Sequence, residues 1–257
     1  MKDFLWWHDG VIYQIYPRSF MDTNGDGIGD LEGIIDKLDY LQDLGVDALW
    51  LSPVYPSPDV DFGYDVTDYC AIDPKFGSMR DFDRLLSQAH KRNIHIIMDL
   101  VLNHTSDQHP WFQESRSSHD NKYRDYYIWK DPKPNGTPPN NWLSIFGGSG
   151  WEFDQQTGQY YFHHFFREQP DLNWRNPEVR KDMLDVFRFW LEKGVDGFRL
   201  DVFSAYFKDA EFRDDPKKLL GLRKYDRLIH EYDADRPEMI PLLKEIRELL
   251  EGYPERY

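Results

Sequence analysis

The feature that most constrains the fold is residues 94–102, an apolar run interrupted only by His95 and Asp99. A strand with apolar side chains on both faces is typical of a parallel sheet that is buried on both faces. Parallel neighbours need long crossover connections, which are usually helical. Three more segments have the composition of strands and are predicted to belong to the same sheet: 11–16, Ala48–Leu51 and 195–200.

Helices are predicted between these strands, because apolar side chains recur there at helical spacing. Ser78 can cap the start of one helix, and Gly45 can cap the end of another. The alternation of strands and helices predicts an α/β fold with a parallel sheet. The expected helices cover residues 31–44, 79–91, Pro177–Lys193 and 239–250.

Two segments interrupt this alternation. Residues 104–176 are too many for an ordinary loop, so we expect a small subdomain with short strands near 160–166, inserted after the third strand. Residues 203–238 are charged and polar, and we expect them to be helical only in part. The predicted organisation is therefore strands one to three with their helices in 1–103, the insertion in 104–176, and a continuation through strand four and its following helix in 177–257.

Composition narrows the class of ligand. The net charge of −15 disfavours nucleic acid and anionic membranes. The 9 Trp, 16 Tyr and 17 Phe suit the stacking of sugar rings, although large side chains in the core explain part of this excess. The single cysteine, Cys70, excludes an internal disulfide, and we expect it to be a small buried hydrophobic residue and not a nucleophile.

The N-terminal residues and the length of the apolar segments indicate where in the cell the protein is located. The N-terminal residues lack an apolar run long enough for a signal peptide. No stretch approaches 18 apolar residues, the minimum for a membrane-spanning helix. We therefore expect a cytoplasmic location.

Arg199 and Asp201 end the fourth predicted strand and lie two residues apart. Alternate residues of a strand point to the same face, so the two side chains should lie together. A neighbouring guanidinium favours the ionised form of a carboxylate and fixes its geometry. Asp201 is therefore a candidate nucleophile. Retaining glycoside chemistry would also need a second carboxyl group as the acid.

Polar side chains also follow the third predicted strand, at Asp99, Asn103 and His104. Asp99 breaks an apolar run, and a buried carboxylate must be paired, for which Arg199 of the neighbouring strand is the candidate. His104 could bind a sugar hydroxyl, or it could only cap a loop. Polar residues at the carboxyl ends of strands favour the first interpretation, because barrel active sites lie there.

A loop after the second strand carries Asp61, Tyr64 and Asp65. A tyrosine ring flanked by two carboxylates suits a sugar held by stacking and by charge-assisted hydrogen bonds. Solvated turn residues are the alternative interpretation of this Gly- and Pro-rich loop.

Residues 22–30 place oxygen-bearing side chains at every second position, with glycines between them. The spacing is similar to the first nine positions of an EF-hand loop, but a glycine stands where that loop needs its final glutamate. It predicts a structural Ca²⁺ site, with Mg²⁺ as a second choice; a loop of Asx turns without an ion is the alternative. The expected ligands are Asp22, Asn24, Asp26, the carbonyl of Ile28, and Asp30.

In their order along the chain, these motifs resemble the α-amylase clan of glycoside hydrolases. The resemblance covers the whole chain and is carried by Gln14-Ile-Tyr-Pro-Arg-Ser-Phe20, the loop 22–30, Gly63-Tyr64-Asp65, Asp99 with Asn103-His104, and Gly197-Phe-Arg-Leu-Asp201. The likeness is greatest to the α-glucosidase and oligo-1,6-glucosidase branch. It implies a (β/α)₈ TIM-type barrel with a subdomain after strand three.

The resemblance also implies roles for individual residues. Asp201 matches the nucleophile and Arg199 the arginine beside it. Val202 matches a position where valine accompanies a preference for α-1,6 over α-1,4 linkages. The residues expected to hold or line the terminal glucose site are Asp61, Tyr64, His104, Phe146 and Phe166.

The family's general acid, a glutamate, follows strand five, and chain order places that strand at or just beyond Tyr257. We therefore expect the N-terminal part of a retaining α-glucosidase, without its acid and inactive alone. Two unpaired sheet edges would favour self-association or pairing with a complementing C-terminal fragment.

Other functions remain open at this point. A transglycosylating relative, which isomerises sucrose or forms trehalose, would share these same residues. A non-catalytic clan member, such as an accessory subunit of a membrane transporter, would keep the fold and lose the chemistry. The expected partner is an oligosaccharide or glucoside substrate, with no nucleic acid and no membrane.

Overall fold

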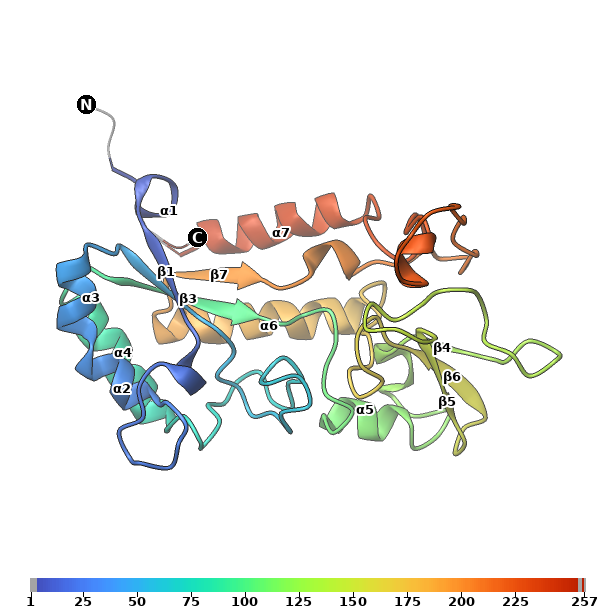
Figure 1. Cartoon of the computed structure of the whole chain (residues 1–257), viewed down its shortest axis with the longest axis horizontal. Helices are drawn as coiled ribbons and strands as arrows, with labels where there is room; N and C mark the ends of the chain where they lie inside the picture. Colours follow the sequence, from blue (N-terminus) through green and yellow to red (C-terminus); the bar gives the residue numbers. More distant parts are fainter. Residues whose placement is uncertain (1–3, 254–255, 257) are drawn as a thin grey trace.

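A four-stranded parallel sheet forms the centre of the computed structural model, which describes residues 4–253 and 256 (Figure 1). Neighbouring strands pair in the order β1-β2-β3-β7, so β1 and β7 are its edges. All three pairings are parallel, as expected from the apolar run at β3. The strands are β1 (Ile12–Ile15), β2 (Ala48–Leu51), β3 (His95–Leu100) and β7 (Gly197–Leu200).

Helices connect these strands and bury their apolar faces in one core. Ser78 forms a capping box with Asp81 at the start of one helix, and Asn176 caps another with its side chain. Gly194, in the left-handed conformation, ends the longest helix directly before β7. The larger helices are α2 (Leu31–Asp36), α3 (Leu38–Leu44), α4 (Met79–His90), α6 (Pro177–Lys193) and α7 (Met239–Glu251).

The first expected helix, 31–44, is wrong in one respect, because the structure divides it in two. Lys37 leaves the helical conformation, with φ −99° and ψ 2°, and separates α2 from α3. The apolar period continues across this break, so the sequence pattern did not reveal it. Shorter helical elements are α1 (Trp6–Asp9), η1 (Pro17–Ser19), α5 (Pro110–Ser115) and η2 (Arg124–Tyr126).

A second, antiparallel sheet lies within residues 104–176, where an inserted subdomain was expected. Its strands pair in the order β4-β6-β5 and carry many aromatic side chains. Figure 1 shows this sheet beyond the carboxyl ends of β3 and β7. The expected strand at 160–166 is shorter and ends at Phe162. The strands are β4 (Trp129–Lys130), β5 (Trp151–Asp154) and β6 (Gln159–Phe162).

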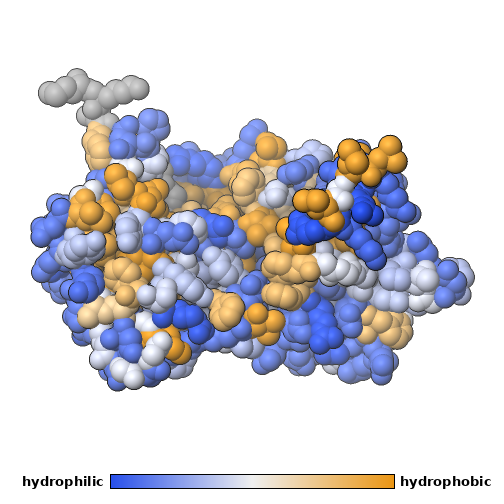
Figure 2. All heavy atoms as spheres, viewed as in Figure 1, coloured by the Kyte–Doolittle hydropathy of each residue, from blue (hydrophilic) through white to orange (hydrophobic). Residues whose placement is uncertain are grey.

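Residues 203–238 follow β7 and form no α-helix. The expected partial helix is limited to two 3₁₀ turns, η3 (Phe203–Ala205) and η4 (Tyr225–Arg227). The segment packs against the insertion, where the side chain of Asn140 donates to the carbonyl of Phe212 at 3.0 Å. Figure 2 shows apolar side chains gathered on the end of the molecule that this segment occupies, and Leu219, Leu220 and Leu222 are 84–100% exposed.

Cys70 is exposed, and the expectation that it is buried was wrong. The residue lies in a turn after the Gly63-Tyr64-Asp65 motif, where the chain runs over the surface.

Within the described residues, no helix combines the length and the apolar character that crossing a membrane requires.

Candidate active site

Asp99, Arg199 and Asp201 meet at the carboxyl ends of β3 and β7. The register of the two strands places Asp99 directly beside Arg199. One guanidinium nitrogen, Arg199 Nη1, donates to both oxygens of Asp99, at 3.0 and 3.1 Å, and to Oδ1 of Asp201 at 2.5 Å. Asp201 is buried, with 8% of its surface exposed, and its N–H donates to the carbonyl of Leu100. The expected pairing is therefore present, and it fixes the carboxylate of Asp201.

Two aromatic residues complete the environment of Asp99. Trp50 Nε1 donates to Asp99 Oδ2 at 3.1 Å, and the Tyr64 hydroxyl lies 3.3 Å from the same oxygen. The guanidinium of Arg199 also lies over the Trp50 ring, 5.0 Å from its centre. Burial raises the pKa of Asp99 to about 6, although the Arg199 charge acts in the opposite direction.

Asp61 and His104 are joined by Gln169, a buried residue that the sequence did not single out. Gln169 Nε2 donates to Asp61 Oδ2 and lies 3.0 Å from both that oxygen and His104 Nε2. His104 Nε2 is also 3.1 Å from the Tyr64 carbonyl. Burial raises the pKa of Asp61 and lowers that of His104, although nearby carboxylates oppose the second shift. Asp61, His104 and Tyr64 therefore lie in one connected polar group.

The aromatic residues expected near this site lie on the insertion. The rings of Phe146 and Phe166 are 4.4 Å apart, and Phe146 is exposed. Phe165 connects them to the polar group, because its ring lies 5.1 Å from that of His104 and 5.7 Å from that of Phe146. Val202 follows Asp201 in the left-handed region, with φ 46°, which is strained for a β-branched residue.

Asn103 belongs to a buried cluster that also includes Lys208, which sequence reasoning missed. The Lys208 ammonium donates to Asn103 Oδ1 at 3.0 Å, to Asp171 and to the carbonyl of Ala205. Asn103 Nδ2 in turn donates to Asp171 Oδ2 at 2.9 Å and lies 3.2 Å from His104 Nδ1. Burial opposes the ionisation of Asp171, but the Lys208 charge holds its pKa below the usual value. The cluster connects the end of β3, the insertion and the segment after β7.

The loop 22–30 folds as a tight series of turns in front of α2. Asp22 accepts from the N–H groups of Gly25 and Gly27, at 2.7 and 2.8 Å, and both glycines have positive φ. Asn24 and Asp26 accept from the N–H groups two residues further on. Asp30 caps α2 by accepting from Gly33. Asp22 Oδ1 and Asp30 Oδ2 each accept two hydrogen bonds. Asp22 Oδ2, Asn24 Oδ1 and both carboxylate oxygens of Asp26 accept one each and keep a lone pair, so these oxygens are compatible with a hard cation.

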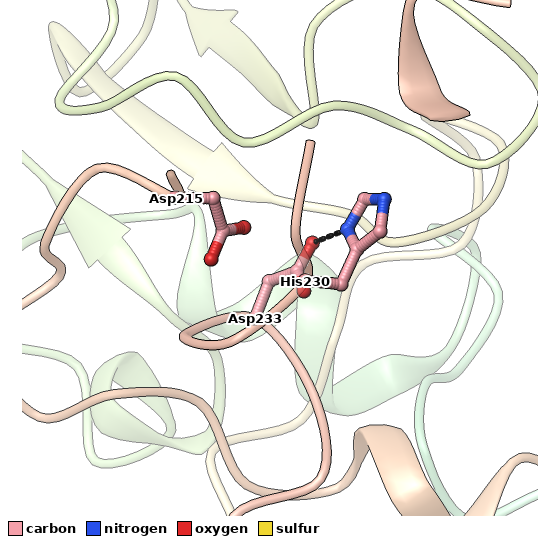
Figure 3. Close-up of side chains that lie close together, drawn as sticks. All are labelled: Asp215, His230 and Asp233. Carbon is pink, nitrogen blue, oxygen red and sulfur yellow. Dashed lines mark hydrogen bonds and ion pairs between the residues drawn. The ribbon is translucent and has the colours of Figure 1, made fainter. Parts of the chain in front are cut away.

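A different group of side chains could hold a metal ion. Asp215, His230 and Asp233 offer one ligand atom each, and these atoms lie within 4.8 Å of one another (Figure 3). This group was not predicted from the sequence, because its members come from the irregular segment 203–238.

The family model for the alpha-amylase catalytic domain matches residues 14–257. The chain belongs to the alpha-amylase family. It is 58% identical to an oligo-1,6-glucosidase of Heyndrickxia coagulans, over 96% of this chain and 44% of that protein. It is 54% identical to a probable alpha-glucosidase of Rhizobium meliloti (strain 1021), over 97% of this chain and 47% of that protein. The solved structure of an alpha-glucosyl transfer enzyme superposes with a TM-score of 0.97 at 52% identity, and the match covers 98% of this chain and 49% of that one.

These comparisons confirm the expected fold. The parallel sheet with its helices is part of the TIM-type barrel of this family, and the antiparallel sheet is an insertion in it. The chain spans less than half the length of the curated relatives described above. The resemblance to the α-glucosidase and oligo-1,6-glucosidase branch is likewise confirmed.

Proposed function

We propose that this chain carries the nucleophile and the glucose-binding side of a retaining α-glucosidase. The enzyme would release terminal α-linked glucose from oligosaccharides, with α-1,6 preferred over α-1,4 linkages. The observation that carries the proposal is the buried Asp201, held by Arg199 in a chain 58% identical to an oligo-1,6-glucosidase.

In the proposed reaction, Asp201 attacks the anomeric carbon of the terminal glucose, and the bond to the leaving sugar breaks. The product is a covalent glucosyl ester, which water then hydrolyses with net retention. Arg199 orients the nucleophile through its hydrogen bond to Asp201 Oδ1. Asp61, Tyr64 and His104 would bind the glucose hydroxyls, while Phe146 and Phe166 would line the outer part of the pocket.

The leaving sugar needs a proton from a second carboxyl group. Asp99 is bound to Arg199 and Asp61 to Gln169, so we assign the acid role to neither. General acids contribute about 10²–10⁴-fold to such reactions. We therefore expect this chain alone to hydrolyse ordinary glucosides slowly.

The linkage preference rests on Val202. Its branched side chain stands directly after the nucleophile, on a backbone held at φ 46°. A rigid side chain at this point can exclude one approach of the second sugar. We propose that it disfavours α-1,4-linked substrates.

Hydrolysis of α-glucosyl fluoride tests the reaction type, because fluoride leaves without a proton from the enzyme. We expect release of fluoride with α-glucose as the first product, detected by NMR before mutarotation. The Asp201→Asn variant should lose this activity. If β-glucose forms first, or if Asp201→Asn retains full activity, the retaining mechanism through Asp201 is wrong.

A transfer reaction is the second candidate function, supported by the 52% identity of the chain to an alpha-glucosyl transfer enzyme. The same glucosyl ester would then pass to a sugar hydroxyl in place of water. Product analysis with glucosyl fluoride and excess maltose distinguishes the two. A new trisaccharide as the main product indicates transfer, and free glucose indicates hydrolysis.

We also propose that the loop 22–30 binds one Ca²⁺, or Mg²⁺, through Asp22, Asn24, Asp26, Asp30 and the carbonyl of Ile28. All these groups are local in sequence, so the ion would stabilise the turn in front of α2 and take no part in the reaction.

A further inference from the structure

Asp215, His230 and Asp233 form a buried cluster in the segment after β7, outside the proposed active site. Asp215 and Asp233 are 2% and 0% exposed, and His230 is partly buried. In Figure 3 the carboxyl group of Asp215 points toward the side chains of Asp233 and His230. The segment brings these groups together from positions up to 18 residues apart.

Each carboxylate of this cluster has one oxygen without a hydrogen-bond donor among the described residues. Asp215 Oδ1 accepts from the N–H of Tyr232 at 2.7 Å, but its Oδ2 has no partner. Asp233 Oδ2 lies 2.8 Å from His230 Nδ1, and its Oδ1 is likewise without a partner. Buried carboxylate oxygens are costly when nothing compensates them, and each such case calls for an explanation.

The orientation of His230 suits metal binding. Its Nε2 lies 3.0 Å from the carbonyl of Tyr225, which can only accept, so Nε2 carries a hydrogen and donates it. The other ring nitrogen, Nδ1, faces Asp233, and a bound metal ion would take the place of the proton that otherwise joins Nδ1 to Asp233 Oδ2. Metal-binding histidines usually hold their second nitrogen in this way, by donating to a carbonyl or carboxylate.

Charge leads to the same conclusion. The two buried carboxylates of the cluster lie close together, and the nearby cation Lys208 is already bound to Asp171. A divalent ion would balance the cluster and bind both unpaired oxygens. The mixed set of one nitrogen and two carboxylates favours a transition metal over Ca²⁺ or Mg²⁺, which prefer oxygen alone.

We propose that Asp215, His230 and Asp233 bind one Zn²⁺ ion, or a transition metal of similar preference. Three protein ligands leave a fourth tetrahedral position for water. The competing arrangement has no metal, with a doubly protonated imidazole paired to Asp233 and donating to Tyr225. That arrangement leaves Oδ2 of Asp215 and Oδ1 of Asp233 without partners.

The site would also fix the segment against the proposed active site. The Tyr225 ring stacks on His230 at 3.9 Å, and its hydroxyl lies 3.3 Å from Nε2 of His164. The His164 N–H donates to Asp171, which belongs to the buried cluster at the end of β3. Metal binding would therefore stabilise the packing of residues 215–233 on the insertion.

Zinc titration of the 257-residue chain tests the proposal, with calorimetry for affinity and elemental analysis for stoichiometry. We expect one Zn²⁺ per chain, a raised thermal midpoint, and an affinity at least about 100-fold lower in His230→Gln. The matched control is His119→Gln, which removes an exposed histidine and should leave binding unchanged. Ca²⁺ should not compete, because its proposed loop at 22–30 is elsewhere.

A spectroscopic measurement distinguishes loss of metal binding from loss of folding. Co²⁺ bound to the wild-type chain should give the strong visible absorption of a tetrahedral site, and Zn²⁺ should abolish it. Asp215→Asn keeps the side-chain volume and should weaken this signal while far-UV circular dichroism stays unchanged. The proposal is overturned if the wild type takes up no stoichiometric Zn²⁺, or if His230→Gln and Asp215→Asn bind it as the wild type does.

Discussion

Arg199 lies between two carboxylates and supplies one positive charge to both. Asp99 is fully buried beneath it, and Asp201 is the more accessible of the two. A single cation cannot compensate two buried anions equally, and this agrees with the raised pKa of Asp99. At the scale of single residues, the burial of Asp99 is therefore only partly compensated by Arg199. The same guanidinium holds the carboxylate of Asp201 in a fixed orientation.

This arrangement predicts how Asp99 affects stability with pH. Its pKa is about 6 in the folded chain and about 3.9 in an unfolded one. Between these values the folded state holds a proton that the unfolded state has lost, so stability falls as pH rises from about 4 to 6. Urea unfolding across this range should show the wild type losing stability relative to Asp99→Asn.

An exposed aspartate provides the control for that experiment. Asp43→Asn changes the same charge at the surface and should show no such window. A stability difference between wild type and Asp99→Asn that does not change with pH would contradict the prediction.

At the scale of elements, the buried side chain of Lys208 joins three parts of the fold. Its ammonium contacts Asn103 after β3, Asp171 of the insertion and the carbonyl of Ala205 after β7. Removing one partner of a buried ion pair typically costs about 3–5 kcal/mol, because the other charge is left uncompensated. Lys208→Met should therefore lower the free energy of unfolding by about this amount, as measured by urea denaturation.

The matched control for Lys208 is Lys181→Met on α6. Lys181 pairs with Asp185 at 2.9 Å but is largely exposed, so the variant should change stability far less. Equal effects of the two substitutions would show that the buried cluster does not hold the elements together.

The loop 22–30 gives a second prediction at this scale. If the loop binds Ca²⁺, adding Ca²⁺ to metal-free protein should raise the thermal midpoint, because the ion binds only the folded loop. The double variant Asp22→Asn, Asp26→Asn should lose this increase, while Zn²⁺ binding at the Asp215 cluster persists. A thermal midpoint indifferent to Ca²⁺ would favour the loop of Asx turns.

Features that depend on neighbouring residues could be predicted from the sequence, whereas contacts between distant residues could not. The strands and α6 were predictable because burial and local caps determine them, and the Asp99–Arg199 pair followed from parallel strands ending at one edge. The break at Lys37 was not, since its helical period continues. Gln169 and Lys208 were missed because their partners, Asp61 and Asn103, lie 108 and 105 residues away. Such contacts depend on how the insertion packs, which no local pattern encodes.

At the scale of the whole molecule, the sheet has two edges, β1 and β7. Val11 and Ile12 at the β1 edge are 56% and 47% exposed, which favours pairing with another chain. We expect sedimentation velocity to show association that increases with concentration. The Ile12→Lys variant should reduce this association, because a charge on an edge strand opposes pairing with another strand. The control variant Tyr40→Lys, at an exposed site on α3, should leave the association unchanged. A monomer at all concentrations would contradict this.

The central claim is that Asp201 is the nucleophile of a retaining α-glucosidase, and covalent trapping tests it most directly. 5-Fluoro-α-glucosyl fluoride carries a leaving group that needs no acid, and its fluorinated sugar slows hydrolysis of the ester that forms. After incubation with this chain and proteolysis, mass spectrometry should find one sugar on the peptide that contains Asp201, and none in Asp201→Asn. A sugar attached to another residue, or an unlabelled Asp201 in a chain that binds glucose, would contradict the account.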